Sequence, residues 1–449
     1  MIQDRQGNPL AGATAAAGEA FDQAVEAFNL YRGDPVALVD GAIETAPDFA
    51  MARLLKAWLF ATATEPAANA EARALLAAAA TLKLGAREAS HATAVAAVLA
   101  GNWTEAALRL DRHNAEWPRD MVAVQAGHLI DFYRASARDL RDRVARVLPQ
   151  WSGATPGRSI LLGMLAFGLE ECGDHARAED KGREAVSIEP LDCWAHHAVA
   201  HVMEMQGRGE DGIGWMIARE PYWSGDENSF KVHNWWHCAL FHLGLGQGPT
   251  ALAVYDEHVA PGAAPTALEL IDASAMLWRL QLAGLEPGGR WDAVAAAWEG
   301  LADGRTYPFN DWHAAMAYLG AGREDEAKRL CAQLRRMEDN EAGRWARETA
   351  LPLIGGFTAF MNGDHDAAVE ALLPARTIAN SFGGSHAQRD IIDWTLAEAA
   401  VRAGRTPLAS ALANERLAHK PRSPAARLLL ARSRAPAPAE ARPPMAKVA

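Results

Sequence analysis

Ala-rich segments with apolar residues on one helical face recur along the chain, and short polar turns separate them. Three turns share one pattern, in which an aspartate follows a proline within two residues. They are Pro47-Asp48, Pro118-Arg119-Asp120 and Pro190-Leu191-Asp192. Their prolines are 71 and 72 residues apart, or two units of a period near 36, and a period of about 34 is typical of tetratricopeptide helical hairpins. We therefore expect stacked helical hairpins, with each proline in the first turn of a helix, where no N–H partner is lost.

Glycines mark the turns inside the predicted hairpins, each followed by a polar residue and another Ala-rich segment. The positions are Gly101, Gly173, Gly207, Gly246, Gly288-Gly289, Gly322, Gly363 and Gly404. From Gly173 onward the intervals are 34, 39, 43, 33, 41 and 41 residues. Glycine is expected here because it ends a helix in the left-handed conformation without a steric penalty. The 72 residues between Gly101 and Gly173 predict one further turn, near Arg134-Ala135-Ser136.

The pattern predicts an all-α fold, because alternating strand patterns with hairpin turns are nearly absent. We expect a right-handed superhelical solenoid of tetratricopeptide-like hairpins, with roughly ten to twelve helix pairs. The expected divisions are an extended N-terminal arm at 1–12, a single solenoid at 13–431 and a disordered tail at 432–449. The tail is rich in alanine and proline and has too few large apolar residues to pack.

Charge and composition argue against several classes of partner. The net charge is −12 and basic residues are not clustered, so we expect neither nucleic acid nor an anionic membrane surface as a partner. The polar N-terminus indicates no secretory signal, and charges interrupt the apolar stretches too often for a membrane-spanning helix. The four cysteines show no paired spacing. We therefore expect reduced thiols and a cytoplasmic protein.

The middle of the chain differs chemically from the rest, because six of the fifteen histidines and five of the fifteen tryptophans fall within residues 194–242. Two sets share a helical spacing, namely His197, His201 and Glu204 at i, i+4 and i+7, and His233 and His237 at i and i+4. Each set projects from one face of a helix. Both segments are expected to be first helices of neighbouring hairpins, which line the concave wall of such a solenoid. The two faces are therefore predicted to border a common space.

Three interpretations of this cluster remain open. One is a metal site, because histidine and glutamate are ligands for zinc, iron or manganese. Its candidate ligands are His197, His201, Glu204, His233 and His237, although the His-Glu-x-x-His motif of zinc proteases is absent. The second is acid–base or ligand-binding chemistry, since imidazoles titrate near neutral pH. The third is structural, with inner helices joined by hydrogen bonds among histidine, asparagine and tryptophan.

Polar residues also recur where later inner helices are expected. They are Asp272 and Arg279; Asn310, Asp311 and His313; and Ser385, His386, Gln388, Arg389 and Asp390. A solvated helix face would carry glutamate and lysine rather than histidine, asparagine and tryptophan. Because an unpaired buried polar group costs about 1–3 kcal/mol, these residues either satisfy one another or bind a ligand. Their recurrence favours a polar cavity.

Four segments give the chain a resemblance to the tetratricopeptide repeat protein 38 family. They are residues 201–208, 233–237, 277–280 and 383–390, of which His-Asn-Trp-Trp-His at 233–237 is a specific string. The resemblance extends from the N-terminal arm to about residue 415. It implies the repeat fold and the protein-binding scaffold usual for such repeats, and it implies no reaction and no ligand set. A wall crowded with histidine and tryptophan instead favours a partly apolar pocket for a small molecule.

The favoured function is therefore the binding of a small molecule, or a short peptide, in a central cavity. The candidate ligand-binding residues are His197, His233, Asn234, Trp236, His313 and Arg389. The alternative is an enzyme that uses the same cavity, with or without zinc, iron or manganese. Its candidate catalytic residues are Glu204, His201, His237, Asp272 and His386, and Arg389 would hold an anionic group. The third alternative is a scaffold for a protein partner, in which the cluster is structural.

Overall fold

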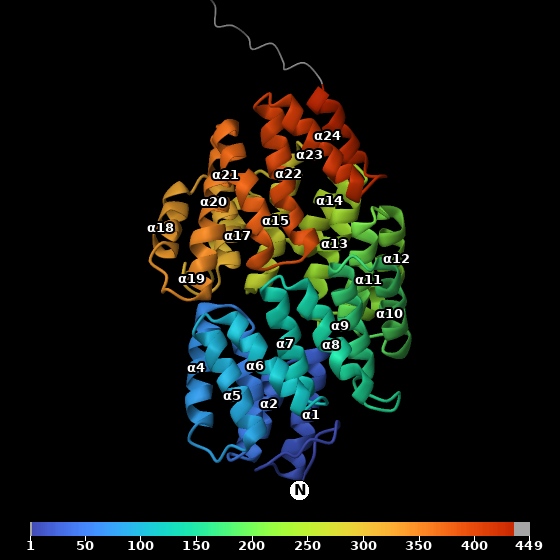
Figure 1. The fold of residues 1–449 in the computed structure, drawn as a ribbon, viewed down its shortest axis with the longest axis vertical. Coiled ribbons are helices and arrows are strands. Elements are labelled where there is room, and N and C mark those ends of the chain that lie inside the picture. Colours follow the sequence, from blue (N-terminus) through green and yellow to red (C-terminus); the bar gives the residue numbers. More distant parts are fainter. Residues whose placement is uncertain (1, 435–449) are drawn as a thin grey trace, which may run out of the picture.

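The structure, a computed structural model, describes residues 2–434 (Figure 1). Its helices are α1 (Ala15–Leu30), α2 (Pro35–Thr45), α3 (Ala50–Ala61), α4 (Pro66–Ala79), α5 (Ala86–Leu99), α6 (Trp103–Glu116), α7 (Met121–Tyr133), α8 (Ala137–Val147), η1 (Leu148–Gln150), α9 (Arg158–Glu171), α10 (His175–Ile188), α11 (Cys193–Met205), α12 (Gly209–Trp223), α13 (Lys231–Gly244), α14 (Gly248–Val254), η2 (Tyr255–Val259), α15 (Ala267–Leu282), α16 (Arg290–Ala297), α17 (Pro308–Gly320), α18 (Glu324–Leu334), α19 (Glu341–Trp345), η3 (Ala346–Ala350), α20 (Leu351–Met361), α21 (His365–Ile378), η4 (Ala379–Ser381), α22 (His386–Arg402), α23 (Thr406–His419) and α24 (Pro424–Arg434). No β-strand occurs within residues 2–434, so the predicted all-α class is confirmed.

Successive helices pair as hairpins from α1/α2 to α22/α23, and the predicted hairpin solenoid is confirmed. The first helix of a pair lies on the inside of the superhelix. Thus α7, α11 and α15 are buried along nearly their whole length, whereas α8 and α18 bury one face and expose charged residues. A helix that is apolar on all sides is typical of a core position. The inner helices therefore bring their side chains together in the middle of the molecule.

Glycines end the first helices in the left-handed conformation, as the sequence predicted. Their φ angles lie between 68° and 80° at Gly101, Gly173, Gly207, Gly246, Gly322, Gly363 and Gly404. For α15 the prediction of Gly288-Gly289 was wrong, because Gly284, with a φ of 86°, ends that helix and Gly288 lies in the loop before α16. The additional turn predicted near 134–136 joins α7 to α8, and Ala135 in it has a φ of 53°. From Gly101 onward the intervals between glycines therefore located the hairpins, including α7/α8, whose turn lacks a glycine. They did not reach the α3/α4 turn, where Thr64 is the left-handed residue.

The prolines of the repeated turns do not lie in the first turn of a helix, contrary to our expectation. Pro47, Pro118 and Pro190 each lie three residues before the first residue of α3, α7 or α11. Asp120 and Asp192 are instead the N-caps of α7 and α11, and their carboxylates accept hydrogen bonds from backbone N–H groups of the first turn. Such a cap satisfies a donor that the helix leaves unpaired. The aspartate, rather than the proline, therefore fixes where these two inner helices begin.

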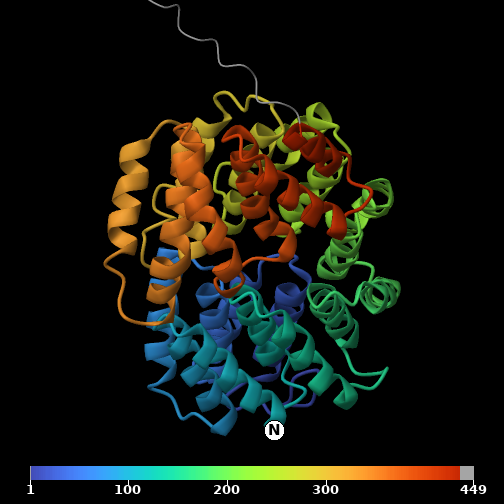
Figure 2. The same ribbon diagram turned by 45° about the horizontal axis from the view of Figure 1, so that its top comes forward.

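The N-terminal and C-terminal halves of the superhelix lie one above the other (Figure 1), and a tilted view shows the same two levels (Figure 2). Hydrogen bonds between distant segments join the levels. The backbone N–H of Thr104 donates to Glu341 at 2.6 Å, and the amide of Asn310 donates to the carbonyl oxygen of Thr64 at 3.0 Å. These pairs are 237 and 246 residues apart in the sequence. The superhelix therefore encloses its inner helices rather than leaving an open groove along them.

Both ends of the described chain pack against the solenoid. Residues 2–14 precede α1, and the buried carboxylate of Asp4 pairs with Arg87 of α5 at 3.3 Å. The C-terminal helix α24 continues to Arg434, so the tail predicted at 432–449 has its first residues in this helix. Residues 435–449 lie outside the described residues. No helix in the described part is both long and apolar enough to cross a membrane.

Candidate functional site

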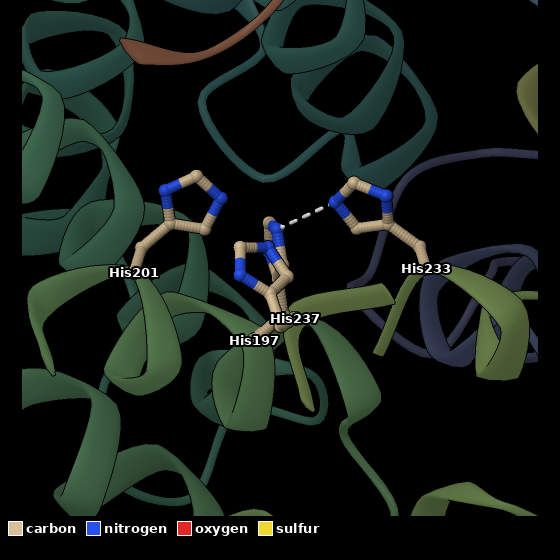
Figure 3. Close-up of side chains that lie close together, drawn as sticks. All are labelled: His197, His201, His233 and His237. Carbon is tan, nitrogen blue, oxygen red and sulfur yellow. Dashed lines mark hydrogen bonds between the residues drawn. The ribbon is translucent and has the colours of Figure 1, made fainter. Parts of the chain in front are cut away.

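Four histidines from two neighbouring inner helices converge in the core (Figure 3). His197 and His201 are one turn apart on α11, and His233 and His237 are one turn apart on α13. One nitrogen from each imidazole lies within 4.8 Å of the nitrogens that the other three offer. We call these four residues the histidine tetrad. The two helical faces that the spacing picked out therefore do meet.

Asp272 of α15 orients one member of the tetrad. Its buried carboxylate lies 2.8 Å from Nδ1 of His233. Because an ionised carboxylate accepts and does not donate, Nδ1 of His233 carries the proton and Nε2 keeps its lone pair. That Nε2 lies 3.1 Å from Nε2 of His197, the contact dashed in Figure 3. Burial raises the pKa of Asp272, and the neighbouring His233 opposes this rise.

The other tetrad nitrogens have no hydrogen-bond partner within residues 2–434. They are both ring nitrogens of His201, both of His237, and Nδ1 of His197. The four side chains are at most 5% exposed, so bulk water does not reach these atoms freely. Each unsatisfied buried polar group costs about 1–3 kcal/mol. The tetrad is therefore destabilising unless another group completes it.

Burial keeps His197, His201 and His237 uncharged. Removal from water lowers the pKa of His201 to about 3, and it lowers the pKa of His197 and of His237 well below the usual value. Glu170 at the end of α9 stands beside His201, with Oε2 3.4 Å from Nδ1. Burial raises the pKa of Glu170 well above its usual range. The neutral imidazole that results is the form that binds metal ions.

An aromatic pocket lies next to the tetrad. Its volume is ≈ 410 Å³, and it lies between helices α1, α3 and α7 of the first level and helices α11, α13 and α15. Its aromatic lining consists of Phe28, Tyr31, Phe60, Phe132, Tyr133, Trp194 and Phe230. His197 and His233 line it as well, so two tetrad imidazoles belong to its wall. A mainly apolar cavity of this size with a few polar groups is typical of a small-molecule site.

Two residues that line the aromatic pocket hold a left-handed backbone without being glycine. Tyr31 at the end of α1 has a φ of 54°, and Thr64 after α3 has a φ of 60°. A β-branched residue such as threonine rarely adopts this conformation, and strain of this kind persists where surrounding contacts hold it. The carbonyl oxygen of Tyr31 accepts from the N–H of Ser229 at 2.8 Å, and that of Thr64 accepts from Asn310. Contacts from the later helices therefore fix this wall of the pocket.

Glu204 does not join the tetrad, although its spacing placed it on the same face. It lies near the end of α11, and its Oε1 pairs with Nζ of Lys420 at 2.5 Å. The carboxylate predicted as a metal ligand on this helix face is therefore paired with a lysine from the segment after α23.

His386 and Arg389 lie at the start of α22 and fasten it to the end of α9. The backbone N–H of His386 donates to Glu171 at 2.9 Å, and the Arg389 guanidinium lies 3.6 Å from the same carboxylate. Arg389 also donates to the carbonyl oxygens of Gly383 and Gly384. Burial lowers the pKa of Arg389. The arginine expected to hold an anionic group is therefore already bound within the protein.

The other predicted ligand-binding residues are divided between the tetrad and its surroundings. Trp236 stacks on His233 with ring centroids 5.3 Å apart. Asn234 is fully buried, and its side-chain amide has no partner in the described chain. His313 lies on α17, where Nδ1 is 2.8 Å from the carbonyl oxygen of Phe309, and burial lowers its pKa to about 3. The structure therefore groups Asp272 and Trp236 with the tetrad and leaves His313 apart.

A second histidine cluster, which the sequence did not lead us to expect, surrounds Asp120. One oxygen of this carboxylate lies 3.0 Å from Nε2 of His91 and 3.1 Å from Nε2 of His113. Arg87 donates to the same oxygen at 2.5 Å, and Nε1 of Trp58 donates to Nδ1 of His91 at 3.0 Å. We call these five residues the Asp120 cluster. Its histidines come from two helices and share no helical spacing. In the sequence, the repeated Pro-x-Asp turn was therefore the feature that could have pointed to Asp120.

The comparisons with known proteins add little to this picture. No family model matches the chain. Among solved structures, the chain is similar to the human IFIT1 dimer with PPP-AAAA, at 14% identity and a TM-score of 0.42, over 92% of this chain and 94% of that one. It is also similar to a chain of the APC/C hetero-tetramer Cut9-Hcn1, at 14% identity and a TM-score of 0.42, over 93% of this chain and 76% of that one. The hairpins of this chain itself carry the fold assignment.

Proposed function

We propose that the protein binds a small, mainly apolar molecule in the aromatic pocket, with the polar end of the molecule against His197 and His233. One observation carries this proposal. A cavity of ≈ 410 Å³ is lined by aromatic rings and carries two buried imidazoles in its wall. Cavities that bind small molecules combine such apolar walls with a few placed polar groups.

The arrangement of the lining favours a molecule with a flat apolar body. Tyr31 stacks on Trp194 with ring centroids 5.9 Å apart, and Phe230 lies 5.3 Å from the same indole. These rings present broad apolar faces whose burial against a ligand is favourable. An oxygen at the inner end of the molecule would pair with an imidazole N–H. The strained backbone at Tyr31 and Thr64 supports a binding role, since such strain gathers at ligand sites.

A pocket-filling variant tests this proposal. Val36 lies in the first turn of α2 and lines the aromatic pocket, so Val36→Trp would occupy part of its volume. Val254→Trp at the end of α14 is the matched control, because that half-buried valine is not among the lining residues. We would screen fatty acids, sterols and planar aromatic metabolites by thermal shift, and analyse denatured protein for retained molecules by mass spectrometry.

A ligand at about 100 times its dissociation constant should stabilise the chain by about 2.7 kcal/mol. We expect this shift in the wild type and in Val254→Trp, and its loss in Val36→Trp. An equal shift in both variants would place binding outside the aromatic pocket. A wild type that retains no molecule and responds to no compound class would contradict the proposal.

Acid–base catalysis in the same pocket is a second candidate, favoured by the pairing of Asp272 with His233. The carboxylate holds His233 in the tautomer whose Nε2 can take a proton, which is the arrangement of a general base. The test is to incubate the chain with the molecule recovered from the pocket and to follow its conversion. We expect His233→Gln to abolish turnover, and an equal rate in that variant would contradict this candidate.

The solenoid fold is also consistent with a protein-interaction scaffold, although the inner helices are enclosed and a partner would have to contact the outer helices. Membership of the tetratricopeptide repeat protein 38 family and a cytoplasmic location complete the proposal. Residues 201–208, 233–237, 277–280 and 383–390 support the family membership. The cytoplasmic location is supported by the cysteines, because all four are free thiols in the structure.

A further inference from the structure

We infer that the histidine tetrad binds one first-row divalent transition metal ion, and that zinc suits it best. This inference goes beyond the proposed ligand pocket and needs no small molecule in it. Zinc binds four ligands tetrahedrally with Zn–N distances of about 2.0–2.1 Å, which places the nitrogens about 3.3–3.4 Å apart. The four tetrad nitrogens already lie within 4.8 Å of one another, and two of them are 3.1 Å apart. Small side-chain movements would therefore complete the tetrahedron.

The tetrad offers lone pairs that no group in residues 2–434 uses. A neutral imidazole carries one N–H and one acceptor nitrogen. Neither nitrogen of His201 or of His237 has a hydrogen-bond partner in that part of the chain, although both rings are 0% exposed. A structural cross-link would pair these atoms, as the carboxylate does in the Asp120 cluster. A cation among the four rings would be bound by the lone pairs of these nitrogens.

Buried carboxylates stand beside two of the four rings, on the side that a metal would leave free. Asp272 lies 2.8 Å from Nδ1 of His233, and Glu170 lies 3.4 Å from Nδ1 of His201. Histidines that bind a metal through one nitrogen usually donate the other N–H to a carboxylate or carbonyl. With Nδ1 turned to a carboxylate, both rings would present Nε2 to the metal.

The donor set selects among metals. Imidazole suits zinc, copper, iron and nickel, whereas manganese and magnesium prefer oxygen ligands. The oxygen ligand expected on this face was Glu204, and it pairs with Lys420 instead. Of zinc, iron and manganese, the arrangement therefore disfavours manganese. Four protein ligands are typical of a closed structural zinc site, and such a site would tie α11 to α13 and position the pocket wall at His197 and His233.

The test uses the full chain without an affinity tag, stripped by a chelator and then titrated with zinc chloride against a competing chelator. Plasma mass spectrometry of the reloaded protein should give about one zinc ion per chain. The double variant His201→Gln, His237→Gln should lose this ion. His313→Gln, which alters an equally buried histidine on another inner helix, should keep it. Asp272→Asn should weaken zinc binding by about 10–100-fold, as expected for a carboxylate behind a ligand.

A measurement on the wild type avoids dependence on variant folding. Cobalt(II) in a tetrahedral nitrogen site absorbs visible light strongly, so the stripped chain should gain such a spectrum with cobalt(II) and lose it to zinc. Absence of the spectrum, or the same zinc content in the double variant as in the wild type, would overturn the inference. The pocket-filling variant Val36→Trp should still bind zinc, which separates a failure of this site from a failure of the aromatic pocket.

Discussion

The histidine tetrad and the Asp120 cluster use the same buried residue type in opposite ways. In the Asp120 cluster one carboxylate accepts hydrogen bonds from two imidazoles and a guanidinium. Burial alone would raise the pKa of Asp120, but Arg87 and the two imidazoles outweigh it and hold that pKa well below the usual range. In the tetrad the imidazoles face one another, and the carboxylates stand outside the group.

This difference separates a structural cross-link from a candidate ligand site. The Asp120 cluster is nearly complete, since Nδ1 of His113 is the single imidazole nitrogen there without a partner in the described chain. The tetrad leaves five imidazole nitrogens without one. Burial and residue type are the same in both places, so hydrogen-bond satisfaction is the observation that distinguishes them.

The largest expected effect is the loss of Asp120. Asp120→Ala would leave Arg87 and two imidazoles without their shared acceptor and would remove the N-cap of α7. Breaking a buried ion pair from one side typically costs about 3–5 kcal/mol. We expect a decrease of this size in the free energy of unfolding, measured by urea denaturation at pH 7.5.

The matched control is Asp192→Ala, because Asp192 caps α11 from the corresponding Pro-x-Asp turn and its carboxylate accepts from no histidine or arginine side chain within residues 2–434. Loss of a cap alone costs about 0.5–2 kcal/mol. Equal losses in the two variants would show that capping, rather than the buried ion pair, is what Asp120 contributes.

The second largest effect is the response to zinc. If the tetrad binds the ion, zinc at about 100 times its dissociation constant stabilises the chain by about 2.7 kcal/mol. We expect this shift in thermal melts of the stripped wild type and of His91→Leu, and no shift in His237→Leu. A zinc response that disappears in His91→Leu would move the metal site to the Asp120 cluster and reverse the comparison.

The sequence determined the fold more completely than the site. Hairpin turns could be located because each needs a left-handed residue, and glycine supplies it at most of them. The tetrad could be anticipated because both of its pairs have a helical spacing on segments that the repeat places side by side. Local periodicity was sufficient for these features.

The other parts of the site depend on contacts between the two levels of the superhelix, which periodicity does not reveal. The aromatic pocket joins Tyr31 and Thr64 to Phe230. Within the first level, Asp120 collects histidines from α5 and α6, which share no helical spacing. The same contacts explain why Arg389 and Glu204 are paired elsewhere, with partners far along the chain. A single sequence carries no direct signal of such pairings.

A smaller effect is expected when one histidine of each cluster is replaced by leucine in the metal-free chain. His91→Leu removes a donor to Asp120 and the acceptor of the Trp58 N–H, so we expect a loss of about 1–3 kcal/mol. His237→Leu removes two nitrogens that have no partner in the described residues, so its stability should be equal to or above that of the wild type. Urea denaturation of both variants after chelation measures the difference. Similar losses would indicate that His237 makes stabilising contacts through its ring.

The smallest effect is a change in acid sensitivity at His313, a buried histidine outside both clusters. Burial lowers its pKa to about 3 from the ordinary value of 6.5. Below pH 6.5 the unfolded chain binds a proton on this ring while the folded chain does not, and this lowers the free energy of unfolding. The contribution of neutral His313 to stability is therefore complete above pH 6.5 and is lost as the pH falls toward 3. The loss is about 1.4 kcal/mol per pH unit well below 6.5. In His313→Leu this contribution is absent, so urea midpoints between pH 6 and pH 5 should fall less steeply than in the wild type. An unchanged slope would mean that the folded protein admits a proton to His313, and burial without an anion would then not be enough to keep a core histidine neutral.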